Sequence, residues 1–366
     1  MPEPFKNFIS PASMAQLADG LFTGTPTFPR DAFLAAAIDG LEPLELKARV
    51  RHVARALHAS LPKDWDTALA VLLAGMGPPL PDDTEVSAGF RYWPVLTVVE
   101  EYGLAHPAAS LAALKEMTKR FSAEFAVRPY LIAHPDLAFS TLTRWCDDSD
   151  VHVRRLVSEG SRPRLPWGQQ LPASIADPSR GIVLLERLVD APERYVQRSV
   201  ANHLNDIAKD HPDRAAKLAS DWSAVVGRAW TVRHGLRTLL KQGHAGALAV
   251  EGYGPLVGTA SGVCASPKVV VLGGSVRVSA RIVSTSKTPQ KLMVDVVVGL
   301  VKKNGTRSGK VFKGAKKVLA AGEVWAFEKV IGLKKVTTRR YYSGVHAVGV
   351  QVNGTVVGTA EFELKV

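Results

Sequence analysis

The sequence predicts two domains of different class, an all-α helical solenoid over residues 1–253 and an all-β sandwich over residues 254–366. A chain of 366 residues is long enough for two separate cores. Up to about residue 250, apolar residues recur at helical spacing, with breaks at Gly, Asp-Pro and His-Pro, and valine-rich alternating segments follow. The charge of the chain also changes near this point.

A weak internal repeat runs through the helical part, with an apolar, a polar and a basic residue in succession and proline once in the basic position. It occurs at Val50-Arg51-His52, Val127-Arg128-Pro129, Val153-Arg154-Arg155, Val196-Gln197-Arg198 and Val232-Arg233-His234. The irregular spacings of 77, 26, 43 and 36 residues centre near that of HEAT-type helical pairs, which stack into a solenoid with a concave binding face. We expect the valines to pack inward and Arg155 and Arg198 to project from corresponding places. Each arginine could instead cap a helix or pair with a carboxylate.

Residues 151–167 predict a short helix that ends in a rigid basic loop. A buried stripe at positions i, i+3 and i+4 comprises Val153, Leu156 and Val157, and we expect Arg154, Arg155 and Ser158 to face solvent or a ligand. Gly160 ends the helix, and the two prolines that follow prevent its continuation. Glu159 is then the last helical carboxylate before a loop that carries Arg162, Arg164 and Trp167. This arrangement favours a site that binds a polyanion and holds one carboxylate and one aromatic ring ready.

Three acidic neighbourhoods stand out in the helical part: Glu124, the aspartates of residues 147–150, and Glu159. The aspartates are best interpreted as N-terminal caps of the following helix. Glu124 and Arg128 are four residues apart, as are Arg155 and Glu159. Each pair could be a plain surface ion pair within one helix, worth about 0.2–0.5 kcal/mol.

The sandwich is predicted from short segments rich in β-branched residues. They are Val269–Val271, Val276–Val283, Leu292–Val298, Leu300–Lys303, Lys310–Phe312, Val345–Val352 and Val356–Phe362. Two Asn-Gly dipeptides separate pairs of these segments, and Asn353-Gly354 is the clearer type I′ hairpin signal because alternating β-branched residues flank it closely. About seven short strands in roughly 105 residues favour an immunoglobulin-like sandwich.

The net charge of +12 lies entirely in the C-terminal third. Residues 254–366 contain 18 Lys and Arg against five Asp and Glu, a net of +13, whereas the remainder has 28 basic and 29 acidic residues. A basic module joined to a nearly neutral one indicates attraction to a polyanion, most often nucleic acid. The alternative is a lysine-rich surface that only favours solubility.

Several other function classes have no sequence support. The chain has no His-Glu-x-x-His motif, phosphate-binding loop, dinucleotide-binding glycine motif or Cys/His cluster with metal spacing. Two distant cysteines, the lack of an apolar run of membrane-spanning length and the N-terminal composition favour a reducing cytoplasm. We therefore expect a protein that uses no metal and contacts no membrane.

Three segments resemble the AlkC-type DNA glycosylases, HEAT-like alkylation-repair enzymes related to AlkD: residues 121–129 (FSAEFAVRP), 153–167 (VRRLVSEGSRPRLPW) and 194–206 (RYVQRSVANHLND). The resemblance covers roughly residues 5–250 and is strongest over 117–245. Its most specific part is Ser-Glu-Gly-x-Arg-x-x-x-x-Trp. Some members of this family carry an immunoglobulin-like C-terminal domain, which agrees with the predicted sandwich.

The resemblance implies cleavage of the N-glycosidic bond of small cationic bases, such as 3-methyladenine and 3-methylcytosine, in bent double-stranded DNA and without flipping of the base into a deep pocket. It also implies catalytic roles for Glu159, Trp167 and Glu124. A carboxylate stabilises the oxocarbenium character of the sugar and orients water, and an aromatic face holds the cation. We expect a shallow electronegative spot to select the lesion.

The remaining expectations concern DNA contacts and alternatives. We expect a monomer without a cofactor whose DNA contacts come from Arg128, Arg154, Arg155, Arg162, Arg164, Arg198, Arg233, Lys302, Lys303, Lys334 and Lys335. A helical repeat by itself argues for binding, so the alternatives are a non-catalytic scaffold for DNA or a protein partner, and a lesion sensor that does not excise.

Overall fold

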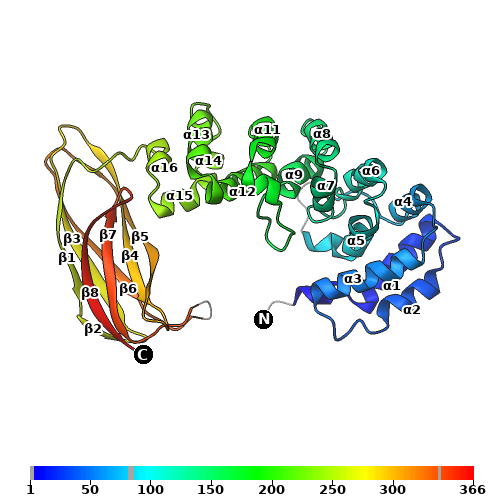
Figure 1. The fold of residues 1–366 in the computed structure, drawn as a ribbon, viewed down its shortest axis with the longest axis horizontal. Helices are drawn as coiled ribbons and strands as arrows, with labels where there is room; N and C mark the ends of the chain where they lie inside the picture. The colour runs from blue at the N-terminus through cyan, green and yellow to red at the C-terminus, as the bar shows by residue number, and fades with distance from the viewer. Residues whose placement is uncertain (1–3, 81–85, 337–338) are drawn as a thin grey trace. The chain divides into compact units, whose positions relative to one another are not determined.

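The computed structural model describes residues 4–80, 86–336 and 339–366, with helices as far as residue 250 and strands from residue 258 (Figure 1). This confirms the predicted succession of an all-α part and an all-β part. By its internal contacts the chain forms two compact units, residues 1–210 and 211–366. The last four helices therefore belong to the same unit as the strands. The expected boundary at 253/254 lies in the connection between α16 (Ala245–Val250) and β1 (Gly258–Ser266).

The first unit contains two short 3-10 helices and twelve α-helices among its described residues. They are η1 (Phe5–Phe8), α1 (Pro11–Gly24), α2 (Arg30–Ile38), α3 (Leu46–Ala59), α4 (Trp65–Ala74), η2 (Val86–Tyr92), α5 (Trp93–Tyr102), α6 (Pro107–Met117), α7 (Arg128–Ala133), α8 (Pro135–Trp145), α9 (Val151–Gly160), α10 (Pro172–Ala176), α11 (Ser179–Leu188) and α12 (Arg194–Asp210). The second unit begins with α13 (Pro212–Ser223), α14 (Ala229–Gly235), α15 (Arg237–Gln242) and α16.

The valines of the internal repeat pack inward, as predicted. Val127, Val153 and Val196 are fully buried, and Val50 and Val232 are each 2% exposed. The aspartate cluster caps α9, because Oδ1 of Asp150 accepts hydrogen bonds from the backbone N–H groups of residues 152 and 153.

The sandwich consists of a three-stranded and a five-stranded sheet. Its strands are β1, β2 (Val269–Val271), β3 (Ser275–Ser284), β4 (Gln290–Val301), β5 (Arg307–Leu319), β6 (Val324–Gly332), β7 (Gly344–Val352) and β8 (Thr355–Lys365). The strand orders are β1-β3-β6 and β2-β8-β7-β4-β5, and β2 pairs with β8 in parallel. Side chains of both sheets form one core, in which Val278 and Phe327 from the smaller sheet meet Val296 and Val350 from the larger. The prediction missed β1 and β6.

The two Asn-Gly dipeptides form different turns. At Asn353-Gly354 both residues have positive φ, 43° and 86°, which confirms the type I′ hairpin between β7 and β8. At the first dipeptide, between β4 and β5, only Gly305 has positive φ, 78°. Asn353 also joins β4 to this hairpin, since its side chain accepts from the backbone N–H of Met293 and donates to the carbonyl of Lys291. The side chain thus adds a specific link that the turn motif alone does not require.

Candidate functional site

Helix α9 carries the predicted apolar stripe and the first candidate carboxylate. Val153, Leu156 and Val157 are fully buried, and the helix ends at Gly160, as expected. The expectation that Ser158 faces solvent or a ligand is wrong. Ser158 is fully buried, and its carbonyl accepts a 3.0 Å hydrogen bond from Nδ1 of His203 on α12. One face of α9 therefore packs on α12, and its residues cannot all line a ligand site.

Glu159 is buried, 6% exposed, and both of its carboxylate oxygens have partners. Oε1 accepts from Nη1 of Arg162 at 2.6 Å and lies 3.5 Å from Nη2 of Arg155. Oε2 accepts from the hydroxyl of Ser199 at 2.7 Å. Burial opposes ionisation, but the two arginines and the hydroxyl outweigh it and hold the pKa of Glu159 below its usual value. Glu159 is therefore a stable anion that its protein neighbours already satisfy.

Arg162 connects Glu159 to Asp206, a carboxylate that the sequence analysis did not consider. Nε of Arg162 donates to Asp206 Oδ2 at 2.8 Å, and Asp206 is 1% exposed. Ser199, His203 and Asp206 lie at i, i+4 and i+7 on α12, so they form a polar stripe on an otherwise apolar helix face. That stripe is a signal in the sequence from which this network could have been predicted.

Glu124 lies in the turn before α7, and its partner differs from the expected one. The predicted pair with Arg128 inside one helix is wrong, because α7 begins only at Arg128. Glu124 instead accepts from Nη1 of Arg155 at 2.5 Å and from the hydroxyl of Ser122 at 3.1 Å. Its side chain is 18% exposed. One guanidinium, that of Arg155, thus lies between Glu124 and Glu159.

The carboxylates of Glu124, Glu159 and Asp206 all lie close to cationic side chains. Arg155 contacts both glutamates, Arg162 contacts Glu159 and Asp206, and the ammonium of Lys209 lies 2.7 Å from Asp206. Each carboxylate therefore has at least one cationic partner. The negative charge of this cluster is compensated within the protein.

Arg128 is fully buried, which contradicts its predicted role as a phosphate ligand. Its Nη1 donates to the carbonyl of Gly160 at 2.8 Å, and its Nε donates to the carbonyl of Gln169. Burial and the nearby Arg162 lower the pKa of Arg128 to about 10. An enclosed guanidinium cannot contact a phosphate. Arg128 instead joins the end of α9 to the loop that follows Trp167.

The other arginines of the first unit that were predicted to bind DNA differ in whether protein groups already pair with them. Arg162 is 6% exposed and occupied by two carboxylates, so it is also unsuited to phosphate contact in this conformation. Arg154 donates to the carbonyls of residues 148 and 149 and to a carboxylate, and Arg164 forms two 2.7 Å bonds with Asp210. Arg198 is exposed and makes no hydrogen bond or ion pair with residues 4–80, 86–336 or 339–366.

Trp167 is the most exposed tryptophan among the described residues, with 62% of its surface accessible to solvent. Its φ is 65°, a left-handed conformation that bulky residues seldom adopt and that costs about 1–3 kcal/mol. The carbonyl of Trp167 accepts a hydrogen bond from the ammonium of Lys47, and Arg128 holds the carbonyl two residues later. The contacts on both sides therefore maintain a strained backbone that presents the indole ring to solvent.

A cavity of about 430 Å³ lies beside Trp167 in the first unit. Helices α3 and α5 provide two of its walls, and the turn before α7 and the Trp167 loop complete it. It is lined by Lys47, Val50, Arg51, Trp93, Thr97, Glu100, Phe125, Trp167, Gly168 and Gln169. The lining residues of α5 lie at i, i+4 and i+7, on one face of the helix. Apart from Trp167, the sequence analysis did not predict a role for these side chains in a site.

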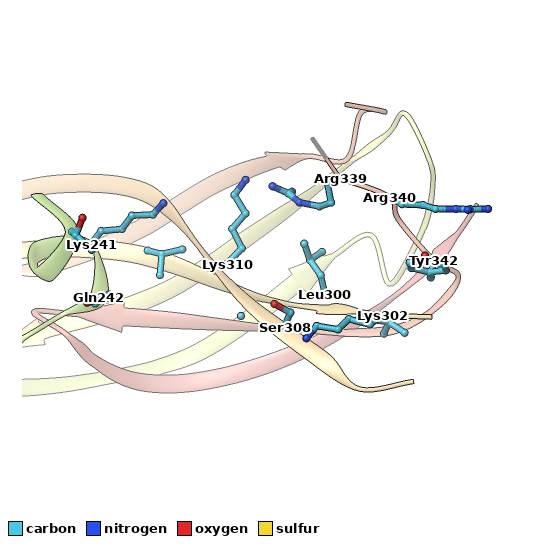
Figure 2. A pocket seen from close by; sticks show the side chains of 13 residues that line it. Lys241, Gln242, Leu300, Lys302, Ser308, Lys310, Arg339, Arg340 and Tyr342 are labelled. Atoms are coloured by element: carbon cyan, nitrogen blue, oxygen red, sulfur yellow. The ribbon is translucent and has the colours of Figure 1, made fainter. Parts of the chain in front are cut away.

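The second unit contains a basic cavity of about 640 Å³, which Figure 2 shows from close by. Its cationic lining residues are Lys241, Lys302, Lys310, Arg339 and Arg340. The pKa of Lys310 is lowered by partial burial and by the positive charges of Arg339 and Lys241. These three side chains therefore lie close enough for their charges to repel one another. Of the predicted basic residues, Lys302 lines the cavity, whereas Lys303, Lys334 and Lys335 are exposed elsewhere on the sandwich. Arg233 on α14 is also exposed, 3.5 Å from Glu251.

Within residues 4–80, 86–336 and 339–366, no group of three or more His, Cys, Asp and Glu side chains is arranged to hold a metal ion. None of the helices there has the length and apolar character needed to cross a membrane.

The fold and the site together place the chain in the class of HEAT-like helical proteins that carry an immunoglobulin-like domain. The family model described as the C-terminal Ig-like domain of the uncharacterised protein YhaZ matches residues 259–366. The uncharacterized protein YhaZ of Bacillus subtilis (strain 168) is 36% identical over 355 residues, 96% of each chain. The solved Pseudomonas fluorescens alkylpurine DNA glycosylase AlkC, bound to DNA containing an abasic site analog, is 36% identical over 100% of both chains, with a TM-score of 0.86. The chain belongs to the family of AlkC and YhaZ proteins.

Proposed function

We propose that this protein is a monofunctional DNA glycosylase that removes small cationic alkylated bases, of the 3-methyladenine and 3-methylcytosine type, from double-stranded DNA. It acts as a monomer in the cytoplasm, without a cofactor and without flipping the base into a deep pocket. The observation that carries the proposal is Trp167, an exposed ring held on a strained backbone. Its loop is joined through Arg128 to the end of α9, the helix that carries Glu159. The full-length similarity to AlkC, an alkylpurine DNA glycosylase, supports the reaction class.

The chemistry requires little acid catalysis, because an N3-alkylated base is already positive. The bond from C1′ to the base nitrogen breaks, its electron pair neutralises the base, and the sugar gains oxocarbenium character. The oxygen of a water molecule then bonds to C1′, and the water proton passes to a carboxylate. Fixed negative charge near the sugar lowers the barrier for this step.

We assign different roles to the two glutamates. Glu124 is the more exposed, at 18% against 8% for the side chain of Glu159, so it is the carboxylate that orients the water. Glu159, held by Arg162 and Ser199, adds negative charge and positions Arg155 against Glu124. The indole face of Trp167 contacts the cationic base or the sugar edge, an interaction worth about 0.5–2 kcal/mol.

DNA contacts come from residues with accessible cationic groups. We assign phosphate contact to Arg198 and Arg233 among the helices, and to Lys302, Lys303, Lys334 and Lys335 in the sandwich, all of which are exposed. Such contacts fix the register of the protein on the duplex, while the site residues select the lesion. Arg155 supports the site through Glu124, whereas Arg154 and Arg164 are paired with Glu193 and Asp210.

Release of free methylated bases from methylated DNA, measured by chromatography, tests this function directly. The wild-type protein should release 3-methyladenine, and Glu124→Gln should reduce the rate at least about tenfold, or about 1.4 kcal/mol. Glu193→Gln is the matched control, because Glu193 also pairs with an arginine of α9 but through Arg154. A wild-type protein that binds methylated DNA and releases no base would instead be a scaffold or a lesion sensor.

A further inference from the structure

The basic cavity of the second unit gathers cations that have no carboxylate partners. The charged ends of Lys241, Lys310 and Arg339 point toward one another, whereas the guanidinium of Arg340 points away (Figure 2). No Asp or Glu occurs among the described residues that line the cavity. The three converging side chains form no ion pair with residues 4–80, 86–336 or 339–366. Their positive charge is therefore not compensated within the described part of the chain.

Neutral groups hold two of these cations in place. The ammonium of Lys310 lies 5.3 Å from the centroid of the Phe312 ring. Nη1 of Arg339 donates to the hydroxyl of Tyr341 at 3.1 Å, and Tyr341 is only 8% exposed. An aromatic face or a hydroxyl orients a cation without neutralising it. Both side chains are thus positioned and keep their full charge for a ligand.

A close contact between two glycines fixes the position of Lys241. Lys241 lies near the end of α15, two residues before Gly243, whose φ is 78°. A Cβ atom added to Gly243 would lie 2.4 Å from Cα of Gly354 in the turn between β7 and β8, so the two backbones touch in a way that no side chain permits. Helix α15 is therefore docked directly on this turn, and Lys241 is held near Lys310 of β5.

The convergence of three cations indicates a phosphate group as the ligand. Like charges that lie together repel one another, and the lowered pKa of Lys310 reflects this repulsion together with partial burial. A phosphate group is anionic and offers several acceptor oxygens, so it can accept from three donors at once. The volume of about 640 Å³ falls within the usual range for small-ligand sites.

Basic groups continue beyond this cavity along α15 and β5. Lys241 also lines a second cavity of about 250 Å³, together with Arg233, Arg237, Lys313 and Lys316. Successive phosphates of a nucleic acid strand match such a row, because each phosphate needs its own cationic contact. A free mononucleotide is the other source of a phosphate group, and the first cavity is large enough to admit one.

We propose that Lys241, Lys310 and Arg339 form a phosphate-binding site, which receives a phosphate group of a DNA strand or of a free mononucleotide. None of the three is among the DNA contacts expected from the sequence. The DNA source rests on the proposed function, whereas the site itself does not. Because the site holds a phosphate, it is independent of how the damaged base is approached.

The first arm of the test uses thymidine 5′-monophosphate and thymidine, which differ only in the phosphate. The full-length protein is titrated by calorimetry at pH 7 and low ionic strength. Wild type should bind the monophosphate at least about tenfold more tightly, which corresponds to about 1.4 kcal/mol. Lys241→Gln and Lys310→Gln should each remove most of this preference. Arg277→Gln, which removes one positive charge from β3 of the smaller sheet, is the control and should retain it.

The second arm titrates an undamaged duplex at several salt concentrations. If the phosphate belongs to DNA, Lys310→Gln should flatten the dependence of log K on log salt by about 0.9, and thymidine 5′-monophosphate should compete with the duplex. Loss of monophosphate binding with an unchanged salt slope would identify a free nucleotide as the source.

Wild-type behaviour of Lys241→Gln and Lys310→Gln in both arms would overturn the inference. Equal losses in Arg277→Gln would also overturn it, because net charge alone would then explain the binding. A protein that binds phosphate through these residues and releases no methylated base would contradict the proposed glycosylase function and still support the phosphate site.

Discussion

Nη1 of Arg155 donates to a carboxylate oxygen of Glu124 at 2.5 Å, across 31 residues of sequence. Both side chains are largely enclosed, with 16% and 18% exposure. The same guanidinium lies 3.5 Å from Glu159 and 5.3 Å from the ring centroid of Tyr195. Arg155 therefore sets the distance between the two glutamates. Its loss would leave two enclosed carboxylates that repel each other.

Removal of the charge of Glu159 should slow excision without weakening DNA binding. Glu159→Gln retains the shape and can still accept from Ser199, but it removes the anion that faces Arg155 and Arg162. We expect the rate of base release to fall at least about tenfold, or about 1.4 kcal/mol of transition-state stabilisation. Single-turnover release assays and DNA titrations measure the two effects. Wild-type rates in Glu159→Gln would show that the residue is only a structural ion-pair partner.

Trp167→Ala should abolish excision and remain as stable as wild type. The ring is 62% exposed, so its removal creates no cavity in the core. Alanine also tolerates the left-handed backbone no worse than tryptophan. By contrast, truncation of a buried aromatic residue costs about 3–5 kcal/mol, and Trp65→Ala, at a site that is 7% exposed, provides that comparison. Thermal melting of the two variants checks the prediction. A large loss of stability in Trp167→Ala would argue against a ligand-facing ring.

Arg128→Met should destabilise the fold and disorder the Trp167 loop. The substitution removes hydrogen bonds to the carbonyls of Gly160 and Gln169, and each buried polar group left without a partner costs about 1–3 kcal/mol. Urea unfolding measures the destabilisation, and excision should fall in parallel. Arg164→Met is the matched control, because Arg164 is partly exposed and pairs with Asp210 at the surface. Similar stability in both variants would show that the buried arginine has no special role.

Stability should decline in mildly acidic solution because of His203. Burial lowers its pKa from 6.5 to about 4, despite the nearby Asp206, so the folded protein keeps the ring neutral while the unfolded chain takes up a proton. The contribution is complete above pH 6.5 and diminishes as the pH falls toward 4. Unfolding free energies measured across this window should therefore decrease for wild type.

His203→Gln isolates this contribution, because glutamine cannot be protonated in this range. Between pH 6.5 and about 4.5 its unfolding free energy should change less with pH than that of wild type. Glu159, whose pKa is lowered, affects stability mainly below its ordinary value of 4.5, so it interferes little in the upper part of the window. Parallel pH profiles for the two proteins would contradict the assignment to His203.

Basic residues of the sandwich should determine much of the salt dependence of DNA binding. Combined Lys302→Gln and Lys303→Gln substitutions should weaken binding to any duplex. They should also flatten the dependence of log K on log salt by about 0.9 for each phosphate that the protein no longer neutralises. Lys317→Gln is the control, because Lys317 already pairs with Glu323. An unchanged salt slope in the double variant would exclude these two lysines from the DNA interface.

Local patterns were sufficient for much of the fold. The inward valines of the repeat, the Asp150 cap, the end of α9 at Gly160 and the Asn353-Gly354 hairpin all depend on neighbours within a few residues. Such features follow from periodicity and backbone preferences, which are visible in one sequence. The prediction missed β1 because its residues, GTASGVCAS, are mostly small or polar. Their place in the sheet depends on pairing with β3.

The sequence by itself determined the two-domain class, the location of the basic charge and the segment that contains Glu159 and Trp167. Tertiary structure decided which charged side chains are accessible to a ligand and which are buried or paired within the protein. It enclosed Arg128 and paired Glu124 with Arg155 instead of with Arg128, four residues along the chain. The physical reason is that the energy of a charge depends on burial and on partners 31 to 44 residues away, which sequence spacing does not reveal.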